Sequence, residues 1–159
     1  MRLITPTQTA SSLESIDLCS LKSRGIKLLL LDIDNTIIPR GDKEAPAEII
    51  NWLIEAKQID LKICLMSNNT KKRFPDLDKY VDDYAIFSRK PFKINYKRLL
   101  RKFEMKEKET VMIGDQIFTD ILGANRLGLH TILVRRQRNY GKFTRKILHW
   151  FEDKLWEKF

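Results

Sequence analysis

Two aspartates, Asp32 and Asp34, directly follow an apolar run and are the residues whose type and spacing most favour chemistry. Residues two apart on an extended backbone point to the same side, so both carboxylates are predicted to converge on one small site at a strand end. Two acids this close repel each other unless a cation lies between them, which predicts a bound divalent metal. Aspartates are also common turn formers, so the pair alone leaves a structural role open.

A second polar cluster follows the apolar run 63–66 and contains Ser67 and Asn68. A hydroxyl and a free backbone N–H at a strand end can hold a phosphate oxygen, although a polar turn is the other interpretation. Lys90 precedes a proline at the start of a predicted helix, where an ammonium group could neutralise phosphate charge. A single lysine in a chain with 30 basic residues carries little information by itself.

A third cluster begins with Gly114 and Asp115, after the apolar run 110–113. Asp120 lies five positions later, in the first turn of a predicted helix. An aspartate there is also an ordinary choice for capping a helix and for its dipole.

The elements that must position these clusters alternate between apolar runs and helix-period stretches, as in a mostly parallel α/β sheet. The predicted strands cover residues 27–33, 61–66, 84–87, 110–113 and 131–134. The predicted helices cover residues 12–24, 46–57, 94–103 and 117–127, with Pro46 suited to a first turn. Open α/β sheets bind ligands outside the carboxyl ends of their strands, so the three clusters should form a single site.

The size and composition of the chain indicate one globular domain spanning residues 1–159, with a core over about 25–135. The 43% hydrophobic content argues against disorder, and no apolar string approaches the roughly 20 residues of a spanning helix. The first residues contain no apolar stretch typical of a secretory signal, so we expect a cytoplasmic protein. Cys19 and Cys64 lack metal-ligand spacing and are predicted to be buried free thiols. The net charge of +9 favours an anionic partner without choosing among nucleic acid, anionic lipid and a phosphorylated ligand.

The four polar motifs, taken in order, resemble those of the haloacid dehalogenase-like (HAD) superfamily. They read D-x-D-x-T, S-N, K-P and G-D-x-x-x-x-D, and they lie within residues 27–134. The resemblance implies a Rossmann-like three-layer α/β sandwich with a mostly parallel central sheet. It also implies a phosphatase, because Asp34 supplies the second acid.

By this resemblance, Asp32 is the expected nucleophile that forms an aspartyl-phosphate, and Asp34 is the expected general acid and then base. The expected cofactor is Mg²⁺, held by Asp32, the backbone carbonyl of Asp34, and Asp115.

The resemblance also implies a phosphate site and its supports. Ser67 and Asn68 would bind the transferring phosphoryl group, Lys90 would offset its charge, and Thr36 would fix the loop beside it. Gly114 and Asp120 are expected to support the site, with Asp120 acting on Lys90 or on the metal.

The spacing of the motifs leaves no room for the cap domain that many relatives carry. Thr36 and Ser67 are 31 positions apart, and Ser67 and Lys90 are 23 positions apart. An open site suits a large or surface-bound substrate, although a cap lent by another subunit is an alternative.

The tail of the chain is basic, with eight basic and three acidic residues over 135–159. A predicted amphipathic helix over about 142–159 has two interpretations. Such a helix can pack on the sheet, or it can lie at the inner face of a membrane as a peripheral contact.

The wording L-L-L-D-I-D-N-T and G-D-Q-x-x-T-D-I-L-G-A-N-R-x-G is similar to that of bacterial YqeG-type proteins, related to organellar phosphatidylglycerophosphate phosphatases. The similarity implies removal of the terminal phosphate of phosphatidylglycerophosphate, an anionic phospholipid, to give phosphatidylglycerol. Three alternatives remain: a nucleic-acid terminal phosphate as substrate, a small soluble phosphate ester as substrate, and a non-catalytic binding protein with the same fold. No nucleic-acid-binding motif supports the first of these. The oligomeric state is left open.

Overall fold

Six parallel strands form one sheet in a computed structural model of the chain, which describes residues 2–39, 42, 44–68, 75–135 and 154–155. The strand order is β1-β6-β5-β2-β3-β4, which confirms the expected α/β class. The strands are β1 (Gln8–Ala10), β2 (Leu28–Asp32), β3 (Lys62–Met66), β4 (Asp83–Ala85), β5 (Thr110–Gly114) and β6 (His130–Val134).

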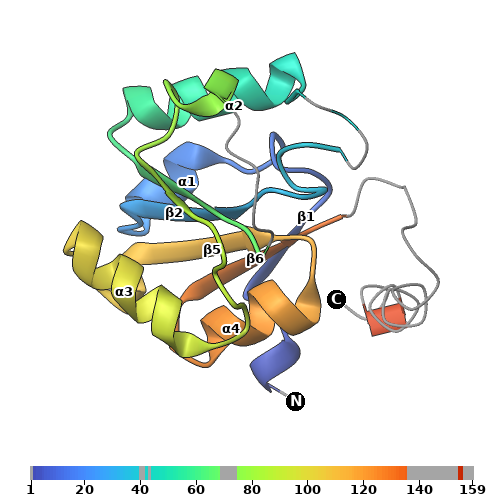
Figure 1. Cartoon of the computed structure of the whole chain (residues 1–159), viewed down its shortest axis with the longest axis vertical. Helices are drawn as coiled ribbons and strands as arrows, with labels where there is room; N and C mark the ends of the chain where they lie inside the picture. Colours follow the sequence, from blue (N-terminus) through green and yellow to red (C-terminus); the bar gives the residue numbers. More distant parts are fainter. Residues whose placement is uncertain (1, 40–41, 43, 69–74, 136–153, 156–159) are drawn as a thin grey trace.

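Helices cover both faces of this sheet, as Figure 1 shows. One layer holds α1 (Leu18–Ser23) and α2 (Ala47–Gln58), and the other holds α3 (Lys93–Phe103) and α4 (Leu122–Asn125). A π-helical turn, η4 (Ile117–Ile121), leads directly into α4. Three short 3₁₀ turns complete the described elements: η1 (Arg2–Ile4), η2 (Pro75–Leu77) and η3 (Glu107–Glu109).

The central strand β2 is buried on both faces, which explains its unbroken leucine run. Leu29 and Leu31 pack in the apolar cluster that includes α1 and α2. Leu28 and Leu30 pack in the cluster that includes α3 and α4. The alternation follows from the two-residue period of a strand, so β2 contributes side chains to the apolar clusters on both faces of the sheet.

The carboxyl end of β2 lies at the topological switch point of the sheet, where the strand order reverses. The chain runs from β2 to β3 and β4 on one side, and then returns to β5 on the other side of β2. Crevices at such reversals are the ligand sites of open α/β sheets. Asp32, the last residue of β2, is placed at this crevice.

The region before β2 differs from the prediction, because the expected helix over 12–24 begins only at Leu18. The carboxylate of Asp17 accepts the Ser20 N–H at 3.0 Å and caps the helix there. The preceding turn is held by the core, since Trp52 Nε1 donates to the Ile16 carbonyl at 3.0 Å. The edge strand β1 was not predicted at all, because its three residues form no apolar run.

Smaller differences arise at element ends. The predicted strand over 84–87 ends at Ala85, and the next two residues are exposed. Pro46 takes the N-cap position of α2 rather than a place in its first turn. Of the two cysteines, Cys64 is buried as expected, but Cys19 is exposed, so that prediction was wrong.

The predicted C-terminal helix over 142–159 lies outside the described residues, except for Lys154 and Leu155. Leu155 packs against the apolar cluster of Ile117, Ile121 and Leu133. In the described part of the chain, no helix has the length and apolar character needed to cross a bilayer.

Asp82 ties the end of α2 to the start of β3, and its replacement should weaken the fold in a pH-dependent way. Its carboxylate accepts the Ile63 N–H at 2.8 Å and the Lys57 ammonium at 2.6 Å. Partial burial raises the pKa of Asp82, but these bonds and the nearby lysine charges outweigh burial and lower it overall. Asp82→Asn should therefore reduce the free energy of unfolding by about 1 kcal/mol at neutral pH.

The folded pKa of Asp82 lies below its unfolded value, so this contribution is present above about pH 4 and is lost as the pH falls through the folded pKa. Urea unfolding of wild type and Asp82→Asn at neutral and acidic pH measures the difference, with exposed Asp78→Asn as a control expected to be neutral. A difference that does not shrink on acidification would contradict this account.

Candidate active site

A buried lysine joins two of the sequence-predicted aspartates at the carboxyl end of the sheet. The Lys90 ammonium forms ion pairs with the carboxylate of Asp32 and, at 2.7 Å, with that of Asp120. It also lies 3.3 Å from the carbonyl oxygen of Met66, at the end of β3. The Lys90 side chain is only 2% exposed. Residues from four parts of the chain therefore meet at one point.

Three buried carboxylates gather around this point, with oxygens of Asp32, Asp115 and Asp120 all within 4.8 Å of one another. Lys90 offsets only part of their negative charge. The second oxygen of Asp32, Oδ2, is buried and has no hydrogen-bond partner among the described residues. Clustered carboxylate oxygens with excess negative charge are the donor set of a hard divalent cation, so these residues fit Mg²⁺.

The electrostatics of the pair follow from its burial. Burial raises the pKa of Asp32, Lys90 lowers it, and the charges of Asp120 and Asp115 raise it further, so that it lies well above its ordinary value. Burial alone would lower the pKa of Lys90, but Asp120 and Asp32 raise it overall, so Lys90 stays charged. A second cation beside Asp32 would favour its ionised form.

The loop after Asp32 folds back on itself and carries the other residues of the first motif. The backbone of Asp34 forms a bridge with Ile38, and the Asn35 N–H donates to the Ile38 carbonyl at 2.9 Å. Asp34 is half-buried, and its carboxylate is not part of the three-carboxylate cluster. The Thr36 hydroxyl is buried without a hydrogen-bond partner among the described residues. It therefore remains available to a ligand.

Ser67 is buried at the end of β3, but its backbone N–H is not free. That N–H donates to the Ala85 carbonyl at 3.0 Å and continues the pairing of β3 with β4. The free backbone N–H expected at this strand end is therefore not that of Ser67, because the pairing of β3 with β4 extends one residue further than the apolar run. The backbone N–H of Ser67 is therefore not available to contact a phosphate.

The side chain of Asn68 holds the backbone of Lys90 from both sides. Its Oδ1 accepts the Lys90 N–H at 2.8 Å, and its Nδ2 donates to the Lys90 carbonyl at 3.1 Å. The Ser88 hydroxyl donates to the same Oδ1 at 3.1 Å. The amide of Asn68 is therefore committed to positioning Lys90, which differs from the direct phosphate contact expected from sequence.

Asn35 and Tyr96 belong to the site and were not singled out from sequence. Asn35 Nδ2 lies 3.4 Å from Asp115 Oδ2, and Asn35 adopts a left-handed backbone with φ of 65°. Its position directly after Asp34, the second acid of the first motif, was the available signal. Tyr96 is fully buried on α3, and burial raises the pKa of its hydroxyl above the ordinary value. The sequence pattern predicts only a core aromatic at Tyr96 and does not indicate that its hydroxyl lies near the Asp120 carbonyl.

Gly114 is required for Asp120 to reach Lys90. A Cβ at Gly114 would overlap the Asp120 carboxylate, which is also held by the Gln116 N–H at 3.1 Å. Gly114→Ala should therefore displace Asp120, lower the free energy of unfolding by about 2 kcal/mol and reduce turnover more than tenfold. Denaturant unfolding and phosphate release measure the two effects.

Gly25→Ala is the matched control, because a Cβ there meets no atom within 4 Å and only its φ of 85° is strained. It should cost about 1 kcal/mol and leave turnover unchanged. Equal activity of Gly114→Ala and wild type would show that activity does not depend on the close contact between Asp120 and Gly114.

Known proteins share both the sequence and the fold. A family model described as HAD-hydrolase-like matches residues 87–149. "Probable phosphatase YqeG" of Bacillus subtilis strain 168 is 37% identical over 115 residues, which cover 72% of this chain and 67% of that protein. The HAD phosphatase from Thermococcus onnurineus has a TM-score of 0.63 at 15% identity, covering 77% of this chain and 98% of that one. A haloacid dehalogenase-like hydrolase from Brucella suis 1330 has a TM-score of 0.64 at 12% identity. The match covers 77% of this chain and 93% of that one.

The two solved structures support the shared fold, and the Bacillus relative supports the family. The chain belongs to the haloacid dehalogenase-like superfamily and is a HAD-type phosphatase. Within that superfamily it is of the YqeG type.

Proposed function

We propose that this chain is a Mg²⁺-dependent phosphomonoesterase that acts through an aspartyl-phosphate on Asp32. The observation that carries the proposal is the state of the Asp32 carboxylate. One oxygen is paired with Lys90, and the other is buried without a hydrogen-bond partner among the described residues. A carboxylate fixed at one oxygen and unsolvated at the other is oriented for attack and loses little hydration on reacting.

The reaction has two displacements at phosphorus. In the first, an Asp32 oxygen forms a bond to phosphorus, the bond to the alcohol oxygen breaks, and Asp34 gives its proton to that leaving oxygen. In the second, water attacks the aspartyl-phosphate, Asp34 takes a proton from that water, and Asp32 and inorganic phosphate are released. Lys90 offsets the charge of the phosphoryl group throughout, and Asp120 holds Lys90 in place.

Other predicted residues support these steps. We assign the hydroxyls of Ser67 and Thr36 to the phosphate oxygens, since both residues are buried, Ser67 directly follows Met66, whose carbonyl meets Lys90, and Thr36 lies in the loop after Asp32. Asn68 acts as a positioning residue, because its side chain holds the backbone of Lys90. Mg²⁺, when bound by Asp32, Asp115 and the backbone carbonyl of Asp34, would supply charge stabilisation for the phosphoryl group.

Metal binding can be tested without turnover. At 100 times its dissociation constant, Mg²⁺ should stabilise the fold by about 2.7 kcal/mol, which raises Tm by roughly 5–10 °C. Asp115→Asn should remove most of that shift, because it removes one charged ligand. Thermal unfolding with MgCl₂, or with KCl at equal ionic strength, measures the effect. The same shift in Asp115→Asn as in wild type would contradict the assigned ligand set.

We further propose phosphatidylglycerophosphate as the substrate, met at the inner face of the membrane. The net charge of +9 favours an anionic lipid surface, and the spacing of the motifs leaves no room for a cap that would enclose a small molecule. The YqeG-type sequence supports the same substrate by resemblance. A nucleic-acid terminal phosphate and a small soluble ester are the competing substrates.

Phosphate release with Mg²⁺ should be compared on three substrates: phosphatidylglycerophosphate in vesicles, a 3′-phosphorylated oligonucleotide and a sugar phosphate. Asp32→Asn and a chelator provide the two inactive controls. Selective turnover of the lipid supports the proposal. Equal or faster turnover of either soluble substrate would refute the lipid assignment, and absence of turnover on all three would refute the catalytic assignment.

A further inference from the structure

Exposed apolar side chains cluster in one short segment beside the site. Of the five large hydrophobic side chains that are exposed in the described residues, four lie in residues 86–94. They are Ile86 (42% exposed), Phe87 (53%), Phe92 (63%) and Ile94 (70%). Scattered exposed hydrophobics are normal, but a concentration of this kind marks an interaction surface.

This 86–94 segment connects the end of β4 to the first turn of α3 and contains Lys90. Burial alternates along residues 87–90: Phe87 and Arg89 are exposed, whereas Ser88 and Lys90 are buried. The segment therefore has an inner side that reaches the catalytic cluster through Lys90 and an outer side that faces solvent. A surface bound by the outer side would lie next to the residues that hold phosphate.

Hydrogen bonds hold this segment in a compact shape. Asn95 Nδ2 donates to the carbonyls of Phe87 and Ser88 at 3.3 and 2.7 Å, and the Phe92 N–H donates to the Arg89 carbonyl at 2.8 Å. Phe87 and Arg89 adopt left-handed backbone conformations, with φ of 53° and 45°. These conformations cost free energy in residues with bulky side chains, and such strain is concentrated at ligand clamps and binding loops.

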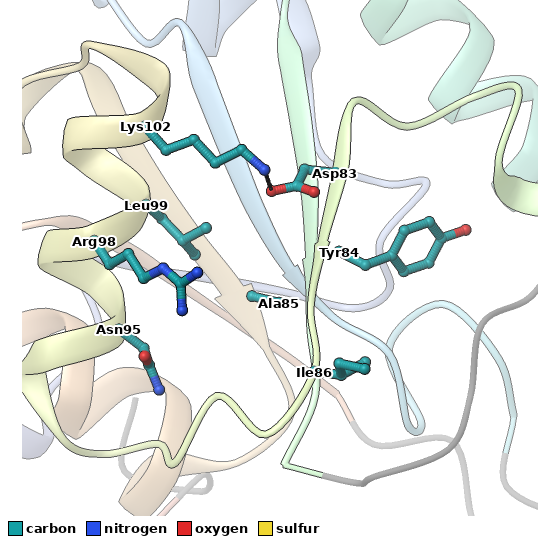
Figure 2. Close-up of a pocket in the computed structure, with 8 residues that line it drawn as sticks. All are labelled: Asp83, Tyr84, Ala85, Ile86, Asn95, Arg98, Leu99 and Lys102. Atoms are coloured by element: carbon teal, nitrogen blue, oxygen red, sulfur yellow. Dashed lines mark hydrogen bonds and ion pairs between the residues drawn. The ribbon is translucent and has the colours of Figure 1, made fainter.

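All charged residues of the segment and of α3 are basic. Between residues 86 and 103 there are seven basic residues and no acidic residue. Exposed Arg89 and Lys93 lie among the apolar side chains, and Arg98 lies further along α3. Figure 2 shows Arg98 and Asn95 extending from α3 toward β4, where they line a pocket of about 220 Å³ that also includes Ile86.

We propose that the 86–94 segment docks on an anionic phospholipid bilayer. Its four apolar side chains enter the interfacial region while Arg89 and Lys93 contact lipid phosphates, which places a headgroup phosphate beside Lys90. The inference rests on the proposed lipid substrate and specifies how that substrate reaches the site. A nucleic acid fits less well, because a base could stack only on Phe87 and Phe92, whereas the most exposed of the four side chains, Ile94, has no ring.

The test uses the full chain and the double variant Phe92→Ser/Ile94→Gln. Phe92 is the N-cap residue of α3, where serine is preferred, and Ile94 is the most exposed of the four, so the variant should fold. Leu3→Gln is the matched control, because Leu3 is 49% exposed and is the one exposed large hydrophobic outside the segment among the described residues.

Co-sedimentation should be measured with vesicles of phosphatidylcholine alone and of phosphatidylcholine mixed with phosphatidylglycerol. Wild type and Leu3→Gln should bind the mixed vesicles, more weakly at high salt, and the double variant should bind at least about tenfold more weakly. Turnover of p-nitrophenyl phosphate should be unchanged in both variants, whereas turnover of vesicle-borne lipid should fall in the double variant alone.

Docking and catalysis can fail separately in this design, because sedimentation needs no turnover. Vesicle binding without lipid hydrolysis would refute the substrate and leave the docking surface supported. Wild type that does not bind anionic vesicles, or a double variant that binds as tightly as wild type, overturns the inference. Loss of oligonucleotide binding in the double variant, when wild type does not bind vesicles, overturns it in favour of a nucleic-acid surface.

Discussion

Asp32→Asn is expected to lower phosphate release by about 10⁴-fold or more while leaving the protein folded. An amide oxygen is a far weaker nucleophile than a carboxylate, so the first displacement should not occur. The fold should tolerate the change, because asparagine has the same shape and its oxygen can still accept a hydrogen bond from Lys90. The change also removes one of the three clustered negative charges, so Tm should stay equal to that of wild type or rise.

A malachite-green assay for phosphate and thermal unfolding measure the two effects. Asp60→Asn makes the same change of charge in the exposed turn between α2 and β3, at the opposite end of the strands, and should leave both values unchanged. Retained turnover in Asp32→Asn would refute the nucleophile. A folded protein with wild-type turnover in Asp60→Asn confirms that charge alone is not responsible.

Lys90→Met is expected to lower both stability and activity. It removes the buried cation between Asp32 and Asp120 and keeps a side chain of similar length. Breaking a buried ion pair from one side costs about 3–5 kcal/mol, because the remaining charges are left uncompensated. For a domain of this size that lowers Tm by roughly 10 °C. Turnover should fall about 10²- to 10³-fold, since the phosphoryl charge is no longer offset.

The double variant Lys90→Met/Asp120→Asn separates the two losses. Neutralising Asp120 removes one uncompensated charge, so the double variant should be more stable than Lys90→Met alone, with a coupling of at least about 1 kcal/mol. Its turnover should stay low, because the cation is still missing. Stability losses that simply add would show that Asp120 and Lys90 do not act as a pair.

The positions of the acids follow from local patterns in the chain. The leucine run before Asp32 and the apolar run before Gly114 each predict a buried strand, and parallel strands bring their carboxyl ends to one edge. Asp32 and Asp115 were therefore placed correctly with no knowledge of tertiary contacts. The short edge strand β1 and the start of α1 at Leu18 were missed, because their stability comes from pairing with β6 and from a single capping side chain.

The partners of the side chains could not be predicted in the same way. Asn68 holds Lys90 across a separation of 22 residues, and Asp120 meets Lys90 only because Gly114 has no Cβ. The Ser67 N–H donates to the Ala85 carbonyl, since β4 pairs with β3 one residue beyond the apolar run. Each of these contacts depends on the register and packing of elements that are distant in the sequence.

Period and spacing in the amino-acid chain were thus enough for the α/β class, the order of the motifs and the position of Asp32 and Asp115 at strand ends. Those features depend on interactions between residues close in the sequence, and these interactions produce the hydrophobic period of a strand or helix. The ion-paired Lys90, the positioning role of Asn68 and the exposed hydrophobic outer side of residues 86–94 emerged only from the folded chain. They depend on which groups lose contact with water, and burial is set by the packing of the whole molecule rather than by any local pattern.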